Sequence, residues 1–262
     1  MQLTGFEGRV ALVTGAGSGI GEGIARALGR SGCKVALTDL NDTAAGRVAA
    51  SMRESGASAR AWKMDVTRSA EVETTVAAVE AELGPIEHLV NVAGIVPRKP
   101  LFDMSDAEWD ELFAINVRGV FVCLRAVAKR MAARRRGAIV TVGSQAGILL
   151  RNHLAHYGAS KAAATYVTKC LGLEIAGSGV RCNVVHPGTT ETPPALASWA
   201  AGIGSREEMI RGNLANFRAP IPLGKVATTA EVAASVLFLL SEQASHITME
   251  DIVVDGGATM IP

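Results

Sequence analysis

The strongest constraint on the fold of this chain is a regular alternation of two hydrophobic patterns. Short runs rich in Val, Leu, Ile and Ala alternate with longer stretches that have the 3.6-residue spacing of an amphipathic helix. The expected strands lie at residues 10–13, 34–38, 59–64, 88–92, 138–142, 180–185 and 252–254, and the expected helices at 20–31, 43–55, 69–83, 106–133, 156–176 and 230–240. Strands that alternate with helices predict a parallel sheet, because each helix returns the chain to the end of the sheet where the previous strand began.

The pattern continues along all 262 residues without a break in composition. We therefore predict an α/β fold: a single domain, residues 1–262, with a doubly wound seven-stranded parallel sheet of the Rossmann type. The longest irregular segment covers about residues 188–222 and follows the sixth strand. Ligands of such sheets bind at the carboxyl ends of the strands, so we expect this segment to be a lid over a substrate.

Composition and charge exclude several classes of function. A formal net charge of +1 provides no overall field for nucleic acid or an anionic membrane. Four scattered cysteines and five histidines show no CxxC or HExxH spacing, so we expect neither a disulfide framework nor a metal site. Because we see no membrane-length apolar run and no apolar signal core in residues 1–8, we expect a cytoplasmic protein. The basic run at 134–136 is expected to end a helix, with Gly137 as its cap.

A glycine-rich loop joins the first strand to the first helix. It reads TGAGSGIG at residues 14–21. Glycines let the backbone turn sharply and approach a pyrophosphate, and the helix that follows offers unpaired N–H groups to the phosphates. A glycine cluster alone could be an ordinary tight turn, but in this position it predicts dinucleotide binding.

Asp39, at the end of the second strand, bears on the choice of cofactor. A carboxylate about 20 residues beyond the loop accepts hydrogen bonds from the adenosine ribose and repels a 2′-phosphate. No Arg or Lys lies within residues 16–18 or directly after Asp39 to reverse that preference. We therefore predict NAD as the cofactor. The alternative is that Asp39 only caps the turn that contains Asn41 and Asp42.

The loop and a set of later motifs resemble the short-chain dehydrogenase/reductase family. These motifs are Asp65-Val66, NVAG at 91–94, Asn116, Ser144, Tyr157 with Lys161 four residues later, and Pro187-Gly188. Each is short, but their order and spacing cover the whole chain. The resemblance implies an NAD-dependent dehydrogenase whose catalytic residues, within the same domain, are Asn116, Ser144, Tyr157 and Lys161.

The chemistry of these side chains agrees with the resemblance. Residues four apart share a face of a helix, so we expect Lys161 to lie beside Tyr157. A neighbouring ammonium should lower the pKa of the phenol, which could then take the proton of an alcohol as hydride leaves the carbon. Ser144 would hydrogen-bond the substrate oxygen. Taken singly, each residue has an ordinary structural explanation, and their combination carries the prediction.

The resemblance also implies a cofactor site and an assembly. The cofactor residues would be Gly15, Ser18, Gly19, Ile20, Gly21, Asp39, Leu40, Asp65, Val66, Asn91, Ala93, Gly94, Tyr157, Lys161, Pro187, Gly188 and Thr190. Asp65 would face the adenine, and the last three would approach the nicotinamide. In the family, the residue matching Asn116 holds a water in a proton relay to Lys161. Helices matching 106–133 and 156–176 pair across two-fold axes there, so we expect a homotetramer.

Longer stretches resemble one group of that family, the 2,3-dihydro-2,3-dihydroxybenzoate dehydrogenases. They lie at residues 173–185, 221–225 and 244–257. Members of the group oxidise a cyclohexadiene alcohol carboxylate to an aromatic catechol in siderophore or secondary-metabolite biosynthesis. Such a substrate needs a carboxylate clamp, and we expect Arg151, with Arg98 as a second candidate, to supply the guanidinium. The chain departs from the group at Pro193-Pro194, where the lid begins.

Alternative functions remain open at this stage. The chain could be a trans-2,3-dihydro-3-hydroxyanthranilate dehydrogenase, which performs the same aromatising oxidation on a ring that bears an amine. It could also be another short-chain dehydrogenase that acts on a sugar, steroid or acyl alcohol. A more distant alternative is a dinucleotide sensor without turnover, although the complete set of catalytic residues argues against it.

Overall fold

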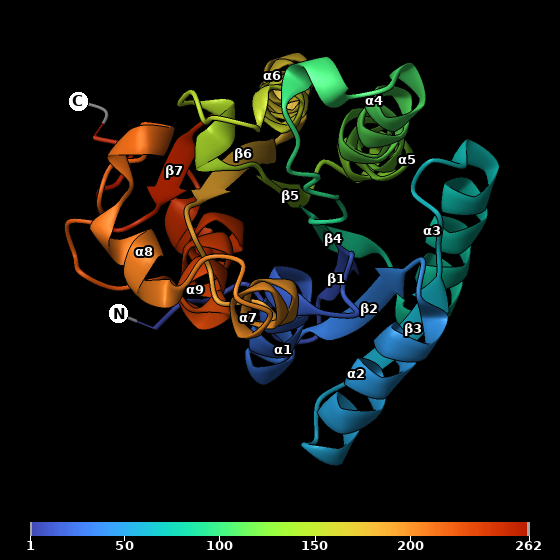
Figure 1. The fold of residues 1–262 in the computed structure, drawn as a ribbon. Helices are drawn as coiled ribbons and strands as arrows, with labels where there is room; N and C mark the ends of the chain where they lie inside the picture. The colour runs from blue at the N-terminus through green and yellow to red at the C-terminus, as the bar shows by residue number, and fades with distance from the viewer. Residues whose placement is uncertain (1, 261–262) are drawn as a thin grey trace.

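The computed structural model describes residues 2–260, so Met1, Ile261 and Pro262 of the predicted 1–262 domain lie outside the described residues. Within them the chain forms a seven-stranded sheet in which every neighbouring pair is parallel, in the order β3-β2-β1-β4-β5-β6-β7 (Figure 1). The strands are β1 (Val10–Thr14), β2 (Lys34–Asp39), β3 (Ala59–Lys63), β4 (Ile86–Asn91), β5 (Gly137–Val142), β6 (Val180–Pro187) and β7 (Asp251–Val254). The predicted α/β Rossmann fold is confirmed.

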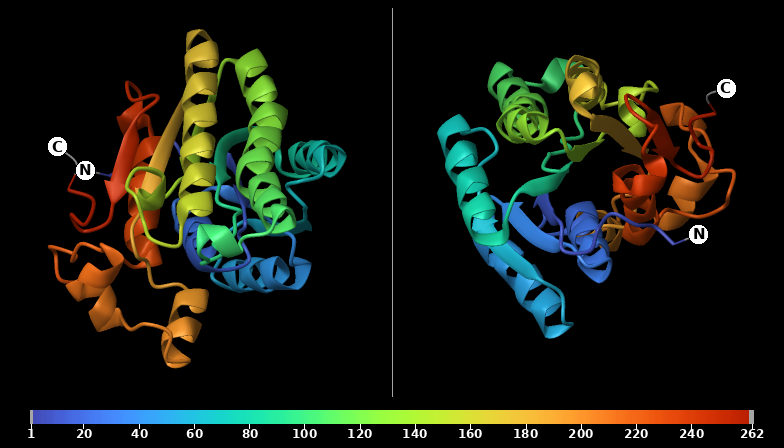
Figure 2. Two further views of the ribbon diagram at one scale, coloured as in Figure 1. Left: turned by 45° about the horizontal axis from the view of Figure 1, so that its top comes forward. Right: turned by 180° about the vertical axis from the view of Figure 1, so that it is seen from behind.

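Helices cover both faces of the sheet (Figures 1 and 2). One core lies under α1 (Gly19–Arg30), α2 (Asp42–Glu54) and α9 (Thr229–Leu240). The other lies under α3 (Ser69–Leu83), α5 (Gly119–Arg134) and α6 (Ala155–Ile175). Because both faces are covered, the central strands are apolar at almost every position rather than at alternate ones. No helix within residues 2–260 has the length and apolarity that crossing a membrane requires.

The strand order reverses between β1 and β4. The chain moves outward from β1 to β3 on one side, returns to β4 beside β1, and then continues outward to β7. The loops that follow β1 and β4 therefore diverge in opposite directions and leave a crevice at the carboxyl ends of the strands. This crevice positions the site described below.

One predicted helix is confirmed with an irregularity inside it, and one predicted helix cap is wrong. The helical stretch expected at 106–133 runs without a break as α4 (Asp106–Phe113), a π-helical segment η2 (Ala114–Arg118) and α5. Gly137 does not cap α5, because Arg135 takes the left-handed position with φ 56° and Gly137 already begins β5. Local patterns therefore report neither the π-helical segment around Asn116 nor the left-handed residue at the end of α5.

The predicted lid region contains more helix than its sequence suggests. Two short helices, α7 (Pro193–Ala200) and α8 (Arg206–Arg211), stand away from the sheet (Figure 2). Pro193 and Pro194 occupy the first positions of α7, where a missing N–H costs nothing because those groups have no partner within the helix. The two prolines that depart from the expected motif therefore start a helix.

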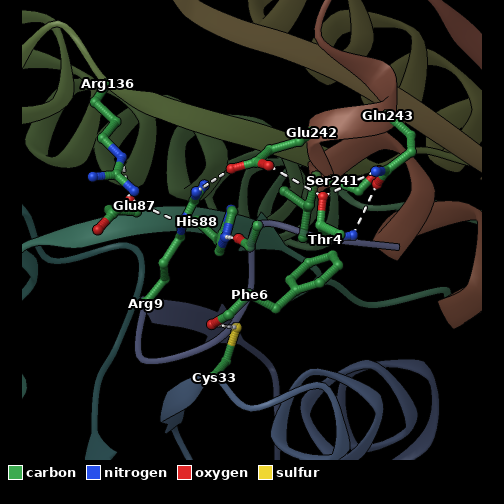
Figure 3. A network of polar contacts seen from close by, with 12 residues as sticks. Thr4, Phe6, Arg9, Cys33, Glu87, His88, Arg136, Ser241, Glu242 and Gln243 are labelled. Atoms are coloured by element: carbon green, nitrogen blue, oxygen red, sulfur yellow. Dashed lines mark hydrogen bonds and ion pairs between the residues drawn. The ribbon is translucent and has the colours of Figure 1, made fainter. Parts of the chain in front are cut away.

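A polar network joins the N-terminal segment to the amino ends of the central strands (Figure 3). Arg9 pairs with Glu242 and with Glu87, 3.6 Å away, and Arg136 also pairs with Glu87, at 2.6 Å. His88, in β4, is buried, and its Nε2 lies 2.9 Å from the Gly5 carbonyl oxygen. This network lies at the end of the sheet away from the crevice.

Candidate active site

A cavity of about 1400 Å³ opens along the carboxyl ends of the strands. Within residues 2–260, its walls contain every predicted site residue except Asn91 and Asn116. The glycine-rich loop, Asp39, Leu40, Asp65 and Val66 line one part of the cavity. Ser144, Tyr157, Lys161, Arg98 and Arg151 line another part, and Pro187, Gly188 and Thr190 line the side from which the lid departs. Tertiary structure therefore gathers residues that are up to 175 positions apart, from Gly15 to Thr190.

Close backbone packing explains the glycines of the loop. Gly15 has φ +63°, and a Cβ there would lie 2.9 Å from the backbone of Ala93. A Cβ on Gly21 would lie 2.0 Å from the Gly15 carbonyl oxygen, so the first turn of α1 packs directly on the loop. The Thr14 hydroxyl accepts hydrogen bonds from the backbone N–H groups of Val92 and Ala93, at 3.0 and 3.1 Å. The loop is thus locked to the end of β4.

Asp39 both caps a turn and holds the loop. Its Oδ1 accepts from the Asn41 N–H and its Oδ2 from the Gly17 N–H, each at 2.9 Å. The carboxylate also lines the cavity. The two interpretations of Asp39 are therefore compatible, because a carboxylate has enough lone pairs to hold the loop and accept further hydrogen bonds.

The walls of this part of the cavity fit a dinucleotide. Ser18, the N-cap residue of α1, makes no side-chain cap bond to any described residue, unlike the N-cap residues Ser105 of α4 and Thr228 of α9. The first N–H groups of α1 and the dipole of the helix therefore face the cavity without a side-chain acceptor. Since Gly19 has φ +57° and no side chain, the backbone there can approach a phosphate closely.

Tyr157 and Lys161 lie on the same face of α6, as predicted. The Lys161 ammonium nitrogen is 5.9 Å from the centroid of the Tyr157 ring and donates a hydrogen bond of 2.9 Å to the Val142 carbonyl oxygen. Burial raises the pKa of Tyr157, against the opposing effect of a hydrogen bond with the Ser144 side chain. Burial also lowers the pKa of Lys161 to about 8. The net shift of the Tyr157 pKa is therefore upward rather than downward as expected, because loss of water dominates at both groups.

Asn116 is buried outside the described cavity walls and connects two segments of the site. It is fully buried in η2; its Oδ1 accepts from the Ile95 N–H at 2.9 Å, and its Nδ2 donates to the Ile95 carbonyl and to the Ser160 hydroxyl, each at 3.0 Å. These bonds tie the loop after β4 to the helix that carries Tyr157. Both amide N–H groups are occupied, so the geometry favours a positioning role for this side chain.

Asn91 lies behind the cavity, unlike the other residues that were predicted to bind the cofactor. Its side chain is buried, and Nδ2 donates to the Thr141 hydroxyl at 3.3 Å, between β4 and β5. It is absent from the described walls of the cavity. Asn91 is the last residue of β4 and is paired with Thr141 of β5, so its side chain contacts the neighbouring strand.

An arginine from the predicted lid region joins the two arginines that were predicted to line the site. Arg218 lines the cavity together with Arg98 and Arg151. Burial, together with the charges of Arg98 and Arg151, lowers the pKa of Arg218 to about 10, which indicates that the three guanidinium groups face a common space. Arg151 donates to Gln145 Oε1 at 3.1 Å, and Arg218 donates to the Thr189 hydroxyl. These bonds hold both side chains in the cavity.

Sequence reasoning missed Arg218 and the apolar residues of the lid. Trp199, Ile203 and Met209 also line the cavity, as do Gln145 and Asn152. A cavity lined by both apolar side chains and guanidinium groups suits a ring that bears an acidic substituent. The lid holds three arginines, at 206, 211 and 218, and nothing in the local pattern says which one turns inward.

Comparison with known proteins agrees with the fold and the motifs. A family model described as Enoyl-(Acyl carrier protein) reductase matches residues 15–259. The chain belongs to the short-chain dehydrogenase/reductase family. It is accordingly an oxidoreductase that acts on a CH–OH donor with a nicotinamide dinucleotide.

Similar proteins span the whole chain. The 2,3-dihydro-2,3-dihydroxybenzoate dehydrogenase of Bacillus subtilis (strain 168) is 46% identical over 260 residues and covers 99% of both chains. The protein of the same name from Escherichia coli (strain K12) is 41% identical over 255 residues, which is 97% of this chain and 98% of that one. Among solved structures, a levodione reductase matches with a TM-score of 0.90 at 29% identity, over 98% of this chain and 100% of the other.

Proposed function

We propose that this enzyme oxidises 2,3-dihydro-2,3-dihydroxybenzoate to 2,3-dihydroxybenzoate with NAD, as a step in siderophore or secondary-metabolite biosynthesis. The observation that carries the proposal is the group of Arg98, Arg151 and Arg218 in the same cavity as Ser144 and Tyr157. In a ring alcohol with a carboxylate, the carboxylate complements the arginines and the hydroxyl group complements Ser144 and Tyr157. The names of the similar proteins from Bacillus subtilis and Escherichia coli support the same substrate.

The proposed chemistry divides between the protein and the cofactor. Tyr157, as phenolate, removes the hydroxyl proton of the substrate, and the Lys161 ammonium stabilises the negative charge on the phenolate. An ion pair between these groups offsets part of the cost that burial imposes on each charge alone. Ser144 donates a hydrogen bond to the substrate oxygen. A nicotinamide dinucleotide bound along the glycine-rich loop would supply the acceptor for the hydride of the carbinol carbon.

The arginines and the ring chemistry together give the proposed reaction its direction. Guanidinium groups bind a carboxylate in a bidentate fork, which fixes the ring relative to Tyr157. Loss of hydride and proton from one ring alcohol leaves a ketone, and the ketone tautomerises to an aromatic catechol. Aromatisation removes the ketone, so the oxidation proceeds in one direction.

Asp39 supports NAD over NADP. Its carboxylate is held at the cavity wall by Gly17 and Asn41, where it would meet the substituents of the adenosine ribose. A 2′-phosphate would meet a fixed negative charge at this point. We also propose that the enzyme acts in the cytoplasm.

Substrate oxidation tests the proposed function directly. Purified enzyme is supplied with 2,3-dihydro-2,3-dihydroxybenzoate or trans-2,3-dihydro-3-hydroxyanthranilate, each with NAD and with NADP, and the reduced cofactor is followed by its absorbance. We expect the highest kcat/KM with the dihydroxybenzoate precursor and NAD, and a rate that rises with pH because Tyr157 acts as a base only in its deprotonated form. The control variant Tyr157→Phe should lose at least about 100-fold in kcat.

Three results would contradict parts of the proposal. Preference for the amine-bearing ring would assign the second substrate. A preference of about tenfold for NADP, worth about 1.4 kcal/mol, would contradict the role of Asp39. Tyr157→Phe turnover above about a tenth of the wild-type value would exclude Tyr157 as the base.

A further inference from the structure

We propose that His186 is a positioning residue for the catalytic serine: its imidazole, held by Asp251, fixes the backbone of Ser144 and thereby the direction of the Ser144 hydroxyl. The inference rests on the proposed function in one respect, namely that the Ser144 hydroxyl acts on the substrate oxygen. His186 itself contacts the protein backbone and does not line the described walls of the cavity.

The contact between His186 and Ser144 is short and buried. His186 lies in β6 with 1% of its side chain exposed, and the Ser144 N–H donates to its Nδ1 at 3.2 Å. The same Nδ1 lies 3.1 Å from the Ser144 carbonyl oxygen. A Cβ on Gly143 would lie 2.5 Å from Nδ1, so the ring reaches this position only because residue 143 is glycine.

Asp251 selects the form of the imidazole that can hold Ser144. The His186 Nε2 is 3.3 Å from Asp251 Oδ1, and Asp251 Oδ2 accepts a hydrogen bond of 2.7 Å from the Lys169 ammonium. A carboxylate accepts but does not donate, so the ring proton of neutral His186 is favoured on Nε2. Nδ1 then keeps its lone pair and accepts the Ser144 N–H.

The network connects Ser144 to α6, the helix that carries Tyr157 and Lys161. Lys169 lies two turns beyond Lys161 on α6, which also carries Tyr157. From Lys169 the contacts pass through Asp251 of β7 and His186 of β6 to Ser144, just beyond the end of β5. A shift of Ser144 relative to Tyr157 therefore requires one of these contacts to break.

Ser144 needs such support because of its place in the chain. The strand β5 ends at Val142, and the Gly143 N–H donates a hydrogen bond of 2.8 Å to the Val185 carbonyl oxygen. Glycine leaves the backbone before Ser144 free to rotate, and a rotation there would redirect the hydroxyl. The Ser144 hydroxyl also accepts from the Ala146 N–H at 3.1 Å and hydrogen-bonds with Tyr157. Its orientation is thus coupled to the proposed base.

Two substitutions separate the halves of the network. In His186→Asn, the shorter amide oxygen lies near the position of Nδ1 and can accept the Ser144 N–H. In His186→Gln, the longer amide reaches toward Asp251 and leaves the Nδ1 position empty. We expect His186→Gln to lower kcat by about tenfold or more with the KM for NAD within about twofold of wild type, and His186→Asn to stay within about threefold in kcat.

A second measurement needs neither substrate nor cofactor. The chain has two tyrosines, so ¹³C labelling at the tyrosine Cζ gives two NMR signals, which the Tyr166→Phe variant assigns. His186→Gln should shift the Tyr157 signal, because the hydrogen bond with Ser144 changes, and His186→Asn should leave it near its wild-type position. His88→Gln is the matched control: His88 is equally buried and lies at the other end of the sheet, so its loss should change neither the Tyr157 signal nor kcat.

The outcomes distinguish this inference from the proposed function. An unchanged Tyr157 signal in His186→Gln would overturn the inference. The inference would also be overturned if the Gln and Asn variants lost kcat equally and each loss of kcat matched the variant's loss of thermal stability. If wild type oxidised neither ring substrate, the proposed function would fail, and the NMR comparison would still decide the role of His186.

Discussion

At the scale of single residues, burial decides which charged forms the fold tolerates, and His88 is a clear case. Burial lowers the pKa of His88 to about 4, with the nearby cations of Arg9, Arg181 and Arg136 acting in the same direction and the hydrogen bond to Gly5 acting against them. The unfolded chain, with an ordinary pKa of 6.5, therefore binds more protons than the folded one between about pH 4 and 6.5. Stability is expected to fall as the pH falls through this window.

The expected loss is about 3 kcal/mol once the pH is below 4, since each pKa unit is worth about 1.4 kcal/mol. Urea unfolding of the wild type and of His88→Gln, at several pH values between 4 and 7, measures the slope. In the variant, the slope of the free energy of unfolding against pH should be smaller by up to the contribution of one bound proton. Parallel pH dependences in the two proteins would show that His88 does not titrate as the structure indicates.

At the scale of elements, the lid carries the arginine that sequence reasoning missed. Arg218 follows the short helices α7 and α8. Its hydrogen bond to the Thr189 hydroxyl joins the end of the predicted lid region to the start of that region, just after Gly188. In the proposed function, segment 188–222 supplies both apolar side chains and a cation to the cavity that holds the substrate. This arrangement makes Arg218 a determinant of carboxylate recognition in the proposed reaction.

Replacing Arg218 with Met tests that role. We expect KM for the carboxylated ring to rise about tenfold or more, because a charge-assisted hydrogen bond contributes about 1.5–3 kcal/mol, with a smaller effect on kcat. A cyclohexadiene diol without the carboxylate should show little change in KM. The matched control is Arg211→Met, which alters an exposed lid arginine outside the described cavity walls. Equal effects on the two substrates would exclude a carboxylate contact.

At the scale of the whole molecule, the outer face of α5 and α6 exposes large apolar side chains. Phe121 of α5 and Tyr166 and Leu173 of α6 are 43%, 72% and 70% exposed. The two helices lie side by side on one face of the sheet (Figures 1 and 2). Exposed apolar residues grouped on paired helices are typical of protein interfaces, and this supports the homotetramer that the family resemblance implies.

Light scattering tests the assembly. At micromolar concentration we expect a mass four times the 27.2 kDa of one chain. A double variant, Tyr166→Glu with Leu173→Glu, should dissociate the tetramer into smaller species, because buried unpaired carboxylates oppose association. The double variant Glu22→Gln with Arg47→Gln, on the opposite layer, serves as the control and should remain a tetramer. A wild-type monomer would contradict the prediction.

Much of the fold and part of the site could be predicted from local patterns. The seven strands, the glycine-rich loop and the Tyr157–Lys161 pair all follow from short periodic spacings, which depend only on neighbours along the chain. The roles of Asn91 and Asn116 could not be predicted in this way. Both are amides at motif positions, yet one bonds across two strands and the other ties a loop to α6.

Local sequence patterns are enough to predict the architecture and the types of chemical group available, because strand and helix periods and glycine requirements act over a few residues. Tertiary structure alone decided which of those groups meet. It turned Arg218 rather than Arg211 into the cavity and placed His186 against Ser144. It also raised the pKa of Tyr157 by removing water from it. These outcomes depend on burial and on contacts between distant segments, which no local spacing encodes.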